Sequence, residues 1–329
     1  RSRNQWYVVL ESKDVPVHKP VGVTRLGEKL VFWRDGSGRV QAMADRCPHL
    51  SASLAQGKIC DDRLVCPFHA FEFDQSGVCR YIPALGKNGA PPKAMHTRTY
   101  PLYEAHGFIW LYWGTPKAAP QPPQWFDIDD RFSYSGYQDP WPVHYSRMAE
   151  NQLDVMHLAH VHTDTIGRAH KVVVEGPVVR LQDDLMQIWV YNRQDTGDPP
   201  RRAGQIDPGA RPPFLEFRFP NLWHNRISAD LRIVAAFVPV DEENGRLIIR
   251  FYQRMVTLPV TRELFNLVGV IGSRHIADQD KRVVSRQLRS ATSLRNGELF
   301  LPGDLAILTF RRHRQALKEL AEQSAESDQ

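Results

Sequence analysis

Two short segments of the chain each place a cysteine close to a histidine. The first reads Cys47-Pro-His49 and the second, after sixteen intervening residues, reads Cys66-Pro-Phe-His69. The proline after each cysteine favours a tight loop that presents backbone amides to the sulfur. Such a ligand set suits a [2Fe–2S] cluster with two cysteines on one iron and two histidines on the other. Structural zinc is the alternative, but zinc fingers pair Cys with Cys and His with His.

A second group of candidate ligands lies between Asn151 and His162, in the pattern N-x-x-D-x-x-H-x-x-x-x-H. Asp154 and His157 share one face of a helix at a spacing of three residues. His162 follows five residues after His157, about 140° round an ideal helix, so the helix must loosen or end before both imidazoles can bind one metal. Two histidines and one carboxylate that leave open coordination positions are typical of Fe(II) oxygenases.

Together these motifs resemble the Rieske non-haem iron oxygenases. The resemblance covers nearly the whole chain, including the stretch Phe310-Arg-Arg312. Two departures lie beside the first motif: the family often has Arg-Gly after the first cluster histidine and Gly-Trp after the second, whereas this chain has Leu50-Ser51 and Ala70-Phe71. Neither change removes a ligand, but both alter hydrogen bonding and solvent access near the sulfurs, which set the cluster potential.

The resemblance implies that the cluster ligands are Cys47, His49, Cys66 and His69. It implies that Fe(II) is bound by His157, His162 and a carboxylate from a later helix. The segment 277–287 resembles that helix, and Asp280 fits its register, with Asp278 as the alternative. The ordinary interpretation of either acid is an exposed helix residue that pairs with Lys281 or Arg282.

The resemblance and the helix spacing give expectations for three further residues near the candidate iron ligands. By resemblance, Asp154 bridges a cluster histidine, His69 or His49, to His157 across the interface between neighbouring subunits, which implies a ring of subunits, most simply a homotrimer. Asn151 is expected beside the iron ligands. His160 is predicted to be a packed or hydrogen-bonded helix residue rather than a ligand.

The resemblance predicts a terminal oxygenase that receives electrons from a separate ferredoxin or NAD(P)H-dependent reductase. With O₂ it would hydroxylate or oxidatively demethylate an apolar, aromatic or cyclic small molecule, because the compact chain resembles the monooxygenating group. A cis-dihydroxylating dioxygenase is the alternative. A Rieske electron-transfer protein without the second iron, or a zinc-binding module, would be a different class of protein.

Composition narrows the partners and the compartment. The chain has 329 residues and a net charge of +5, but its 42 basic residues are scattered among 37 acidic ones, so we expect no nucleic-acid partner. No apolar run is long enough to span a membrane, and no secretory signal is evident. Two of the four cysteines, Cys60 and Cys79, are expected to be free, packed thiols, and a cytoplasmic protein is predicted.

An α+β fold with two domains is predicted. Residues 1–117 read as an antiparallel β domain of short strands, such as 6–10, 29–33 and 108–112. A proline-rich linker, 116–123, leads into residues 118–329, predicted as a helix-grip (START-like) catalytic domain with an antiparallel sheet and a long C-terminal helix. Helices are expected at 147–158 and 261–288, and frayed residues from 321 onwards.

The substrate site is expected on the second sheet, beneath a lid formed by the Pro/Gly/Arg-rich stretch 196–213. Aromatic side chains on strands are candidate lining residues: Trp189, Tyr191, Phe217, Phe219, Trp223 and Phe237. Such residues are more often plain core. The lid arginines Arg201, Arg202 and Arg211 are interpreted mainly as solvated residues, with a role in holding a carboxylate as the alternative.

Overall fold

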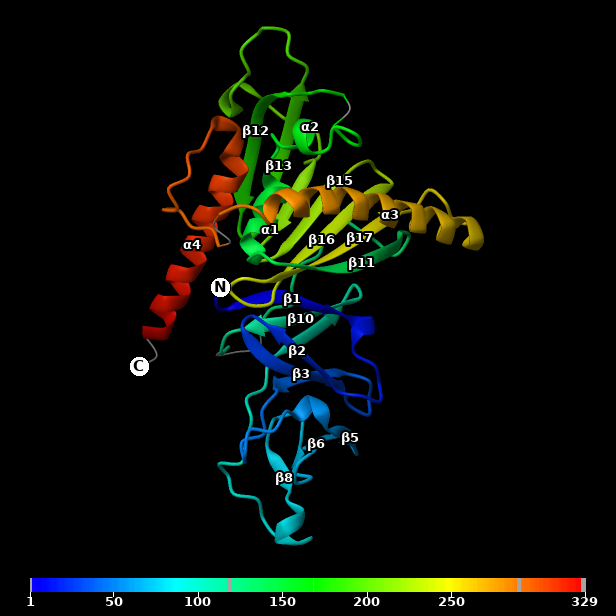
Figure 1. Cartoon of the computed structure of the whole chain (residues 1–329), viewed down its shortest axis with the longest axis vertical. Coiled ribbons are helices and arrows are strands. Elements are labelled where there is room, and N and C mark those ends of the chain that lie inside the picture. The colour runs from blue at the N-terminus through cyan, green and yellow to red at the C-terminus, as the bar shows by residue number, and fades with distance from the viewer. Residues whose placement is uncertain (1, 117–119, 168, 289–290, 327–329) are drawn as a thin grey trace. The chain divides into compact units, whose positions relative to one another are not determined.

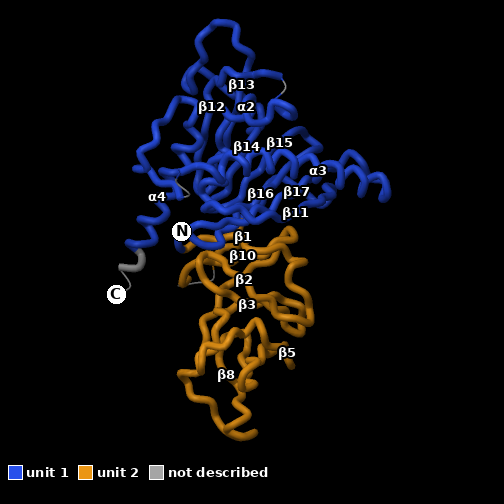
Figure 2. The backbone as a smooth tube through the Cα atoms, in the orientation of Figure 1, with its two compact units in different colours: residues 1–3, 124–329 blue, residues 4–123 orange. Residues whose placement is uncertain are grey.

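The computed structural model describes residues 2–116, 120–167, 169–288 and 291–326. The polypeptide forms two compact units (Figure 2). One unit comprises Asn4–Pro123, and the other comprises Gln124–Gln329 together with Arg1–Arg3. Each unit has hydrophobic clusters of its own, so each can hold a site on its own framework.

The first unit is built from three small antiparallel sheets with the strand orders β1-β10-β9, β2-β3-β4 and β5-β6-β7-β8 (Figure 1). Alternate side chains of the first two sheets enter one shared core around Tyr7, Leu30 and Ile109. The strands span β1 Gln5–Glu11, β2 Val21–Arg25, β3 Glu28–Arg34, β4 Val40–Ala44, β5 Lys58–Cys60, β6 Arg63–Val65, β7 Glu72–Phe73, β8 Cys79–Tyr81, β9 Leu102–Ala105 and β10 Phe108–Trp113.

The second unit is organised around one antiparallel sheet of seven strands in the order β11-β17-β16-β15-β14-β13-β12. Neighbouring strands pair in long continuous registers, such as Leu222–Arg226 opposite Arg232–Ala236. The sheet is therefore a rigid support for the helices that pack on it. Its strands span β11 Ser133–Trp141, β12 Val173–Gln182, β13 Leu185–Arg193, β14 Leu215–Arg218, β15 Leu222–Arg226, β16 Leu231–Pro239 and β17 Gly245–Gln253.

Helices pack on one face of this sheet (Figure 1). They are α1 Tyr145–Leu153, α2 Leu158–Val161, α3 Pro259–Val284 and α4 Leu305–Glu326. The core between sheet and helices joins Phe217, Trp223 and Phe237 of the strands to Met148, Ala277 and Phe310 of the helices. Short 3-10 turns complete the chain: η1 Ser12–Asp14, η2 Leu54–Gln56, η3 Pro83–Leu85, η4 Ala203–Gln205 and η5 Pro302–Asp304.

A buried ion pair fixes α1 against α4. The Arg311 guanidinium donates from Nε and Nη2 to the two oxygens of Glu150, at 2.7 Å each. Arg311 also donates to Glu298, which accepts from Arg147 of α1 at 2.8 Å. Bidentate pairing holds both groups in one geometry, so α1 cannot rotate without breaking charge-assisted bonds. The arginine that carries this pair lies in the Phe310-Arg-Arg312 stretch.

The predicted α+β fold, with an antiparallel β unit, a large antiparallel sheet and a long C-terminal helix, is confirmed. Some boundaries were wrong. The helix expected over 147–158 is two helices, because Asp154 is extended (φ −73°, ψ 115°) and ends α1. The long helix begins at Pro259 and ends at Val284. The tail expected to fray from residue 321 continues α4 to Glu326, because Ala and Glu have high helix propensity.

Among the described helices, none is long and apolar enough to cross a bilayer.

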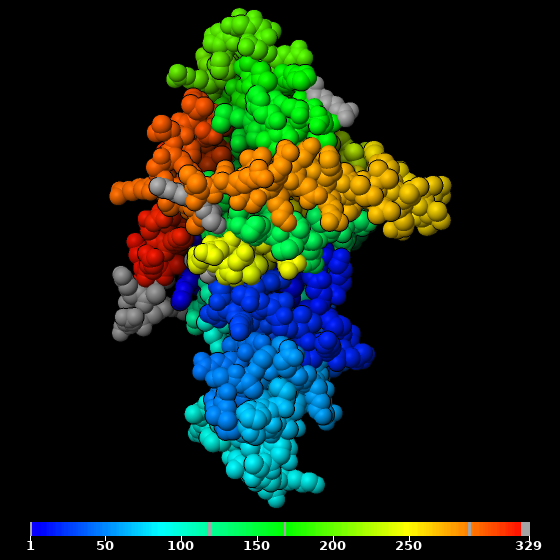
Figure 3. Space-filling model, viewed as in Figure 1, coloured from blue at the N-terminus to red at the C-terminus, as the bar shows by residue number. Residues whose placement is uncertain are grey.

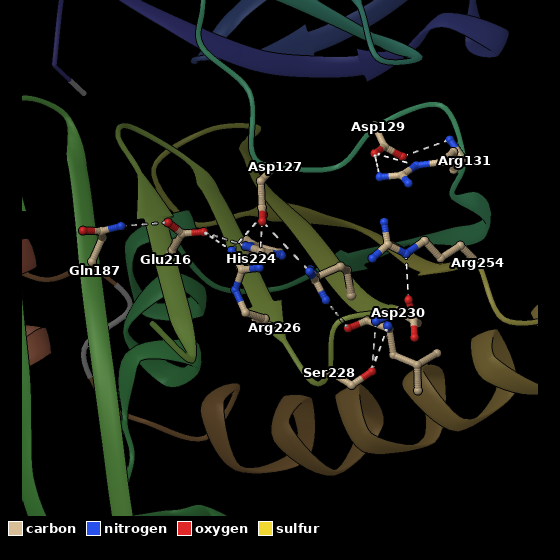
Figure 4. Close-up of polar contacts among 12 residues, drawn as sticks. Asp127, Asp129, Arg131, Gln187, Glu216, His224, Arg226, Ser228, Asp230 and Arg254 are labelled. Carbon is tan, nitrogen blue, oxygen red and sulfur yellow. Dashed lines mark hydrogen bonds and ion pairs between the residues drawn. The ribbon is translucent and has the colours of Figure 1, made fainter. Parts of the chain in front are cut away.

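The sheet face opposite to the helices carries a polar cluster around β14 and β15, in which Glu216 and His224 are buried and Asp127 is exposed (Figure 4). His224 Nδ1 lies 2.9 Å from Glu216 Oε2, and the Arg226 guanidinium holds both oxygens of Asp127, at 2.7 and 2.8 Å. One ligand atom each of Asp127, Glu216 and His224 lies within 4.8 Å of the others. The guanidinium already neutralises Asp127 and lies 3.8 Å from Glu216, so this cluster does not call for a metal cation.

This cluster predicts acid-sensitive stability. Burial lowers the pKa of His224, although Glu216 partly opposes the shift. Below about pH 6.5 the unfolded chain takes up a proton that the folded chain refuses, so stability falls as pH falls. Burial raises the pKa of Glu216, but bonds from His224 and Gln187 lower it overall, so its contribution is also lost in acid.

We therefore expect His224→Gln to flatten the fall in the thermal midpoint of the second unit between pH 7 and pH 5, measured by circular dichroism. The matched control is His275→Gln, which changes an exposed histidine of α3 and should leave the slope unchanged. An unchanged slope in His224→Gln would show that other groups dominate the acid sensitivity.

Candidate metal centres

Three side chains of the second unit converge on one point. His157 and His162 flank α2, and Asp280 lies in the last third of α3. The Nε2 atoms of the two imidazoles lie 3.4 and 3.1 Å from Asp280 Oδ1. The carboxylate of Asp280 is almost wholly buried, with the residue 1% exposed. The break after Leu153 turns the chain, which brings both imidazoles to one side.

Hydrogen bonds set the orientation of both imidazoles. The Nδ1 of His157 lies 2.8 Å from the main-chain oxygen of Asp154, and the Nδ1 of His162 lies 2.8 Å from Oε1 of Gln279. Each acceptor requires a proton on Nδ1, so in the neutral ring the lone pair of Nε2 points towards Asp280. Gln152 donates from Nε2 to the other Asp280 oxygen, at 2.9 Å.

This arrangement fits a metal cation. Two imidazole lone pairs facing one carboxylate oxygen repel each other and the carboxylate unless a cation lies among them. Asp280 Oδ1 is buried and has no geometrically sound hydrogen-bond donor. Burial raises the pKa of Asp280, but the two imidazoles hold it far below its usual value. Burial lowers the pKa of His157, but Asp280 raises it overall, which again marks an excess of negative charge.

In the first unit, the two Cys/His segments form loops with the same hydrogen bonds. The N–H of Cys47 donates to Ala52 and that of Cys66 donates to Phe71, each to the carbonyl five residues on, at 2.8 Å. The residue four places after each cysteine, Ser51 or Ala70, donates its N–H back to the cysteine carbonyl. Both have positive φ, at 61° and 54°.

These loops present a donor set that suits a [2Fe–2S] cluster. Cys47 and Cys66 are buried in one core cluster, whereas His49 and His69 are exposed with ring centroids 4.8 Å apart. Burial raises the pKa of the Cys47 thiol to about 11, a backbone N–H of His49 opposes the shift, and Cys66 adds to it. Neighbouring buried thiols become thiolates only beside a positive metal centre, so the loops fit such a cluster.

The other cysteines differ from each other. All four cysteines are free, as expected for Cys60 and Cys79. Cys79 is buried beside the cluster loops, but Cys60 is exposed, so the prediction that both are packed was wrong for Cys60. Its position at the end of the short edge strand β5 leaves it without a covering layer.

A cavity of about 320 Å³ opens beside the three convergent ligands. Its floor is the sheet, including Trp223, and its walls are the ends of α1, α2 and α3, including Leu158 and Ile276. Most of the lining is apolar. A second, wider cavity of about 550 Å³ shares Leu158, Ile166 and Phe214 with the first and carries charged side chains. We call them the inner and the outer cavity.

The aromatic residues expected at the substrate site divide among four places. Trp223 lines the inner cavity and Tyr191 lines the outer one. The remaining four do not line either cavity: Trp189 is buried below the loop 196–213, and Phe217, Phe219 and Phe237 form an aromatic core. The three phenylalanines share a sheet face with Trp223, since Phe217 pairs with it, but Phe217 and Phe219 pack against Phe310 of α4 instead of facing the cavity.

The arginines of the loop 196–213 also divide. Arg201 bonds Glu175 of β12 through Nε and Nη2, at 3.0 and 2.5 Å, which ties the loop to the sheet. Arg201 and Arg211 line the outer cavity, and Arg202 is exposed. The interpretation of these arginines as solvated residues is therefore incomplete, because Arg201 forms an ion pair with Glu175 that fixes the loop.

Other predicted residues lie as follows. Asp278 is exposed, so the structure brings Asp280 and not Asp278 to the imidazoles. His160 is exposed on α2, contrary to the expected packing, because α2 is a single short turn. Asn151 lines a separate cavity with Arg147 and Glu150 and does not line the inner cavity. Asp154 lines the inner cavity and also the separate cavity beside Asn151.

The carboxylate of Asp154 accepts the Met156 N–H at 2.7 Å and lies 3.8 Å from His157 Nδ1. Sequence reasoning missed Gln152 and Gln279, which bond the ligand side chains directly. Glutamines next to candidate ligands carry no distinctive spacing, so no sequence signal marks them.

The fold and these sites define a class: a β unit with mixed Cys/His cluster loops, followed by an α+β unit with a two-histidine, one-carboxylate centre. Residues 5–101 match the Rieske [2Fe-2S] domain, and residues 141–320 match the vanillate O-demethylase oxygenase C-terminal domain. The chain belongs to the Rieske non-haem iron oxygenase family, whose cofactors are a [2Fe–2S] cluster and a mononuclear iron.

The chain is also similar to individual proteins. The chain is 36% identical to a putative toluene-4-sulfonate monooxygenase system iron-sulfur subunit, TsaM2, of Comamonas testosteroni over 66% of this chain and 72% of the relative. It is 33% identical to the chloroplast protein TIC 55 of Arabidopsis thaliana over 49% of this chain, but spans only 31% of that protein. The structure of dicamba monooxygenase bound to dicamba superposes with a TM-score of 0.75 at 23% identity, over 97% of this chain and 98% of the other.

The positive φ of Ala70 predicts a stabilising substitution. Alanine in the left-handed region costs about 1–2 kcal/mol, whereas glycine there loses only its extra unfolded-state entropy of about 0.5–1 kcal/mol. We expect Ala70→Gly to stabilise the first unit by about 0.5–1 kcal/mol, seen as a higher midpoint for thermal loss of cluster absorption.

The matched control is Ala84→Gly, an exposed position in η3 of the same unit without positive φ. It should lower the midpoint. If both variants lower it, the loop is not strained at Ala70.

Proposed function

We propose that this chain is the terminal oxygenase component of a Rieske system that monooxygenates an apolar, aromatic or cyclic small molecule, by hydroxylation or oxidative demethylation. The observation that carries the proposal is the convergence of His157, His162 and Asp280 beside an enclosed apolar cavity. A substrate in that cavity lies next to a centre with three protein ligands and open positions, as oxygen activation requires.

In this proposal residues 1–117 hold the cluster through Cys47, His49, Cys66 and His69, and residues 118–329 hold the Fe(II). When bound, the cluster supplies electrons and the iron supplies the activation of O₂. The net reaction inserts one oxygen atom of O₂ into a C–H bond, while two electrons and two protons convert the other atom to water.

The side chains of the second unit prepare this chemistry without forming covalent bonds to the substrate. Gln279 and the main-chain oxygen of Asp154 hold the imidazoles in the tautomer that presents Nε2. Gln152 holds the outer oxygen of Asp280, which leaves Oδ1 for the metal. The apolar walls exclude water and orient the substrate C–H bond.

The competing class, a Rieske electron-transfer protein, explains less. Such a protein needs the cluster loops but neither a second donor set nor a cavity beside it. Three ligand side chains from two different segments, with hydrogen bonds that fix both imidazoles, would then be unused. The inner cavity therefore favours an oxygenase.

We propose that a ferredoxin or an NAD(P)H-dependent reductase docks near the cluster loops. The exposed His49 and His69 lie beside Leu50 and Phe68, which are each 61% exposed. Exposed apolar side chains around a redox centre favour a transient protein partner. Because all four cysteines are free, we place the protein in a reducing compartment, the cytoplasm.

We further propose a homotrimer in which Asp154 bridges a cluster histidine of one subunit to His157 of the next. The first half of α3 supports an assembly surface, because it is uncovered on the face shown in Figure 3. Its exposed apolar residues are Val260, Leu264, Leu267, Val268 and Ile271. An apolar stripe of this kind is typical of a surface that is buried in an oligomer.

Removal of the carboxylate ligand should separate catalysis from the cluster. We expect Asp280→Ala to keep the visible Rieske spectrum but to lose the mononuclear iron and to lower substrate oxidation by more than about 100-fold, with a surrogate reductase and a panel of methoxylated and N-methylated aromatic compounds. Iron per chain and product formation are the measurements.

Asp278→Ala is the matched control, since Asp278 is the exposed acid two residues away and should tolerate the change. Full activity of Asp280→Ala with loss in Asp278→Ala would contradict the assigned ligand. Products that carry two new hydroxyl groups would instead indicate dihydroxylation.

Co-assembly tests the trimer. A Cys66→Ala chain lacks a cluster, and an Asp280→Ala chain lacks the second iron, so neither should oxidise substrate alone. Mixed oligomers should recover part of the wild-type activity, because in some interfaces an intact cluster faces an intact iron. No recovery from a verified mixed oligomer would mean that electrons move within one chain.

A further inference from the structure

The imidazoles of the two candidate metal centres are held in different ways. At the iron site, the Nδ1 atoms of His157 and His162 each lie 2.8 Å from a hydrogen-bond acceptor. At the cluster loops, neither ring of His49 and His69 makes a hydrogen bond to another described residue, and both rings are exposed. Such a bond normally fixes the orientation of a metal-bound imidazole. The cluster histidines must therefore be oriented by packing.

The side chain of Phe71 packs on one face of the His49 imidazole. The two rings are almost parallel, with centroids 5.0 Å apart and 16° between their planes. Rings at this separation and angle are offset-stacked, which is a favoured arrangement. Phe71 is only 6% exposed and belongs to the hydrophobic cluster that contains Cys47 and Cys66. Because its own surroundings are closely packed, the phenyl ring is a fixed support for the exposed imidazole.

Phe71 also connects the two cluster loops. Its carbonyl accepts the N–H of Cys66 in the second loop at 2.8 Å, whereas its ring stacks on His49 of the first loop. The same ring lies 6.0 Å from His69, with 49° between the planes. Phe68 lies closer to His69, at 3.9 Å, but is 61% exposed and has no comparable support. Phe71 is thus the buried aromatic residue that contacts both loops.

We propose that Phe71 is a positioning residue for the cluster ligand His49. Its ring holds the plane of the imidazole in place of a hydrogen bond and keeps water from one imidazole face. In the oxidised cluster two ferric ions are balanced by two sulfides and two thiolates, so one-electron reduction leaves a single negative charge. Water stabilises that charge better than an apolar ring does, so loss of the ring raises the reduction potential.

Redox titration and electron paramagnetic resonance of the cluster-loaded full chain test this role. At one fixed pH, we expect Phe71→Leu to shift the reduction potential upwards and to broaden the g values of the reduced cluster, because the imidazole then adopts several orientations. Phe71→Trp keeps an aromatic face and should retain both properties. The matched control is Phe73→Leu, which removes a fully buried ring of the same hydrophobic cluster and should change neither property.

An unchanged potential with unchanged g values in Phe71→Leu would overturn the proposal. An equal shift in Phe73→Leu would overturn it too, since general packing would then set the potential, as would a Phe71→Trp shift as large as that of Phe71→Leu. If Phe71→Leu binds no cluster, Phe73→Leu decides: a loaded control supports a specific need for the ring, and an empty control refutes it. No substrate is present, so the result does not depend on the oxygenase function.

Discussion

The buried carboxylate of Asp280 is the constraint on which the second unit depends. A negative charge that is 1% exposed, with two imidazole lone pairs directed at it, is stable only when a cation completes the group. Much of the surrounding structure serves that arrangement: α1 stops at Asp154, the Arg311–Glu150 pair holds α1 against α4, and Gln152 and Gln279 position the ligands.

Local patterns were enough to predict the parts of the sites that lie close together in sequence. Both Cys/His segments and the pair His157 and His162 follow from ligand type and spacing, but the helix breaks at Asp154, before His157, and not between the two histidines. Asp280 came from family resemblance, because nothing in an isolated helix distinguishes it from Asp278 until the helix is packed. Gln279 and Gln152 matter through contacts with ligands more than 100 residues away in sequence, which no local pattern records.

The strand β15 shows why the cavity itself was harder to predict. Its sequence, Leu-Trp-His-Asn-Arg, has no simple apolar alternation. Its two faces have different tasks: Trp223 and Asn225 line the cavity, whereas His224 and Arg226 belong to the polar cluster behind the sheet. Both faces are partly polar, so the period-two signal that identifies a half-buried strand is lost.

The helix α3 carries two surfaces on one continuous rod. Its apolar stripe ends at Ile271, and Asp280 follows nine residues later, about 13 Å along the axis. An α-helix resists twisting because every residue is tied to the next turn by hydrogen bonds. Whatever binds the stripe therefore also sets the angle at which Asp280 meets the two imidazoles, so a loosened oligomer would show itself first as a poorly shaped iron site.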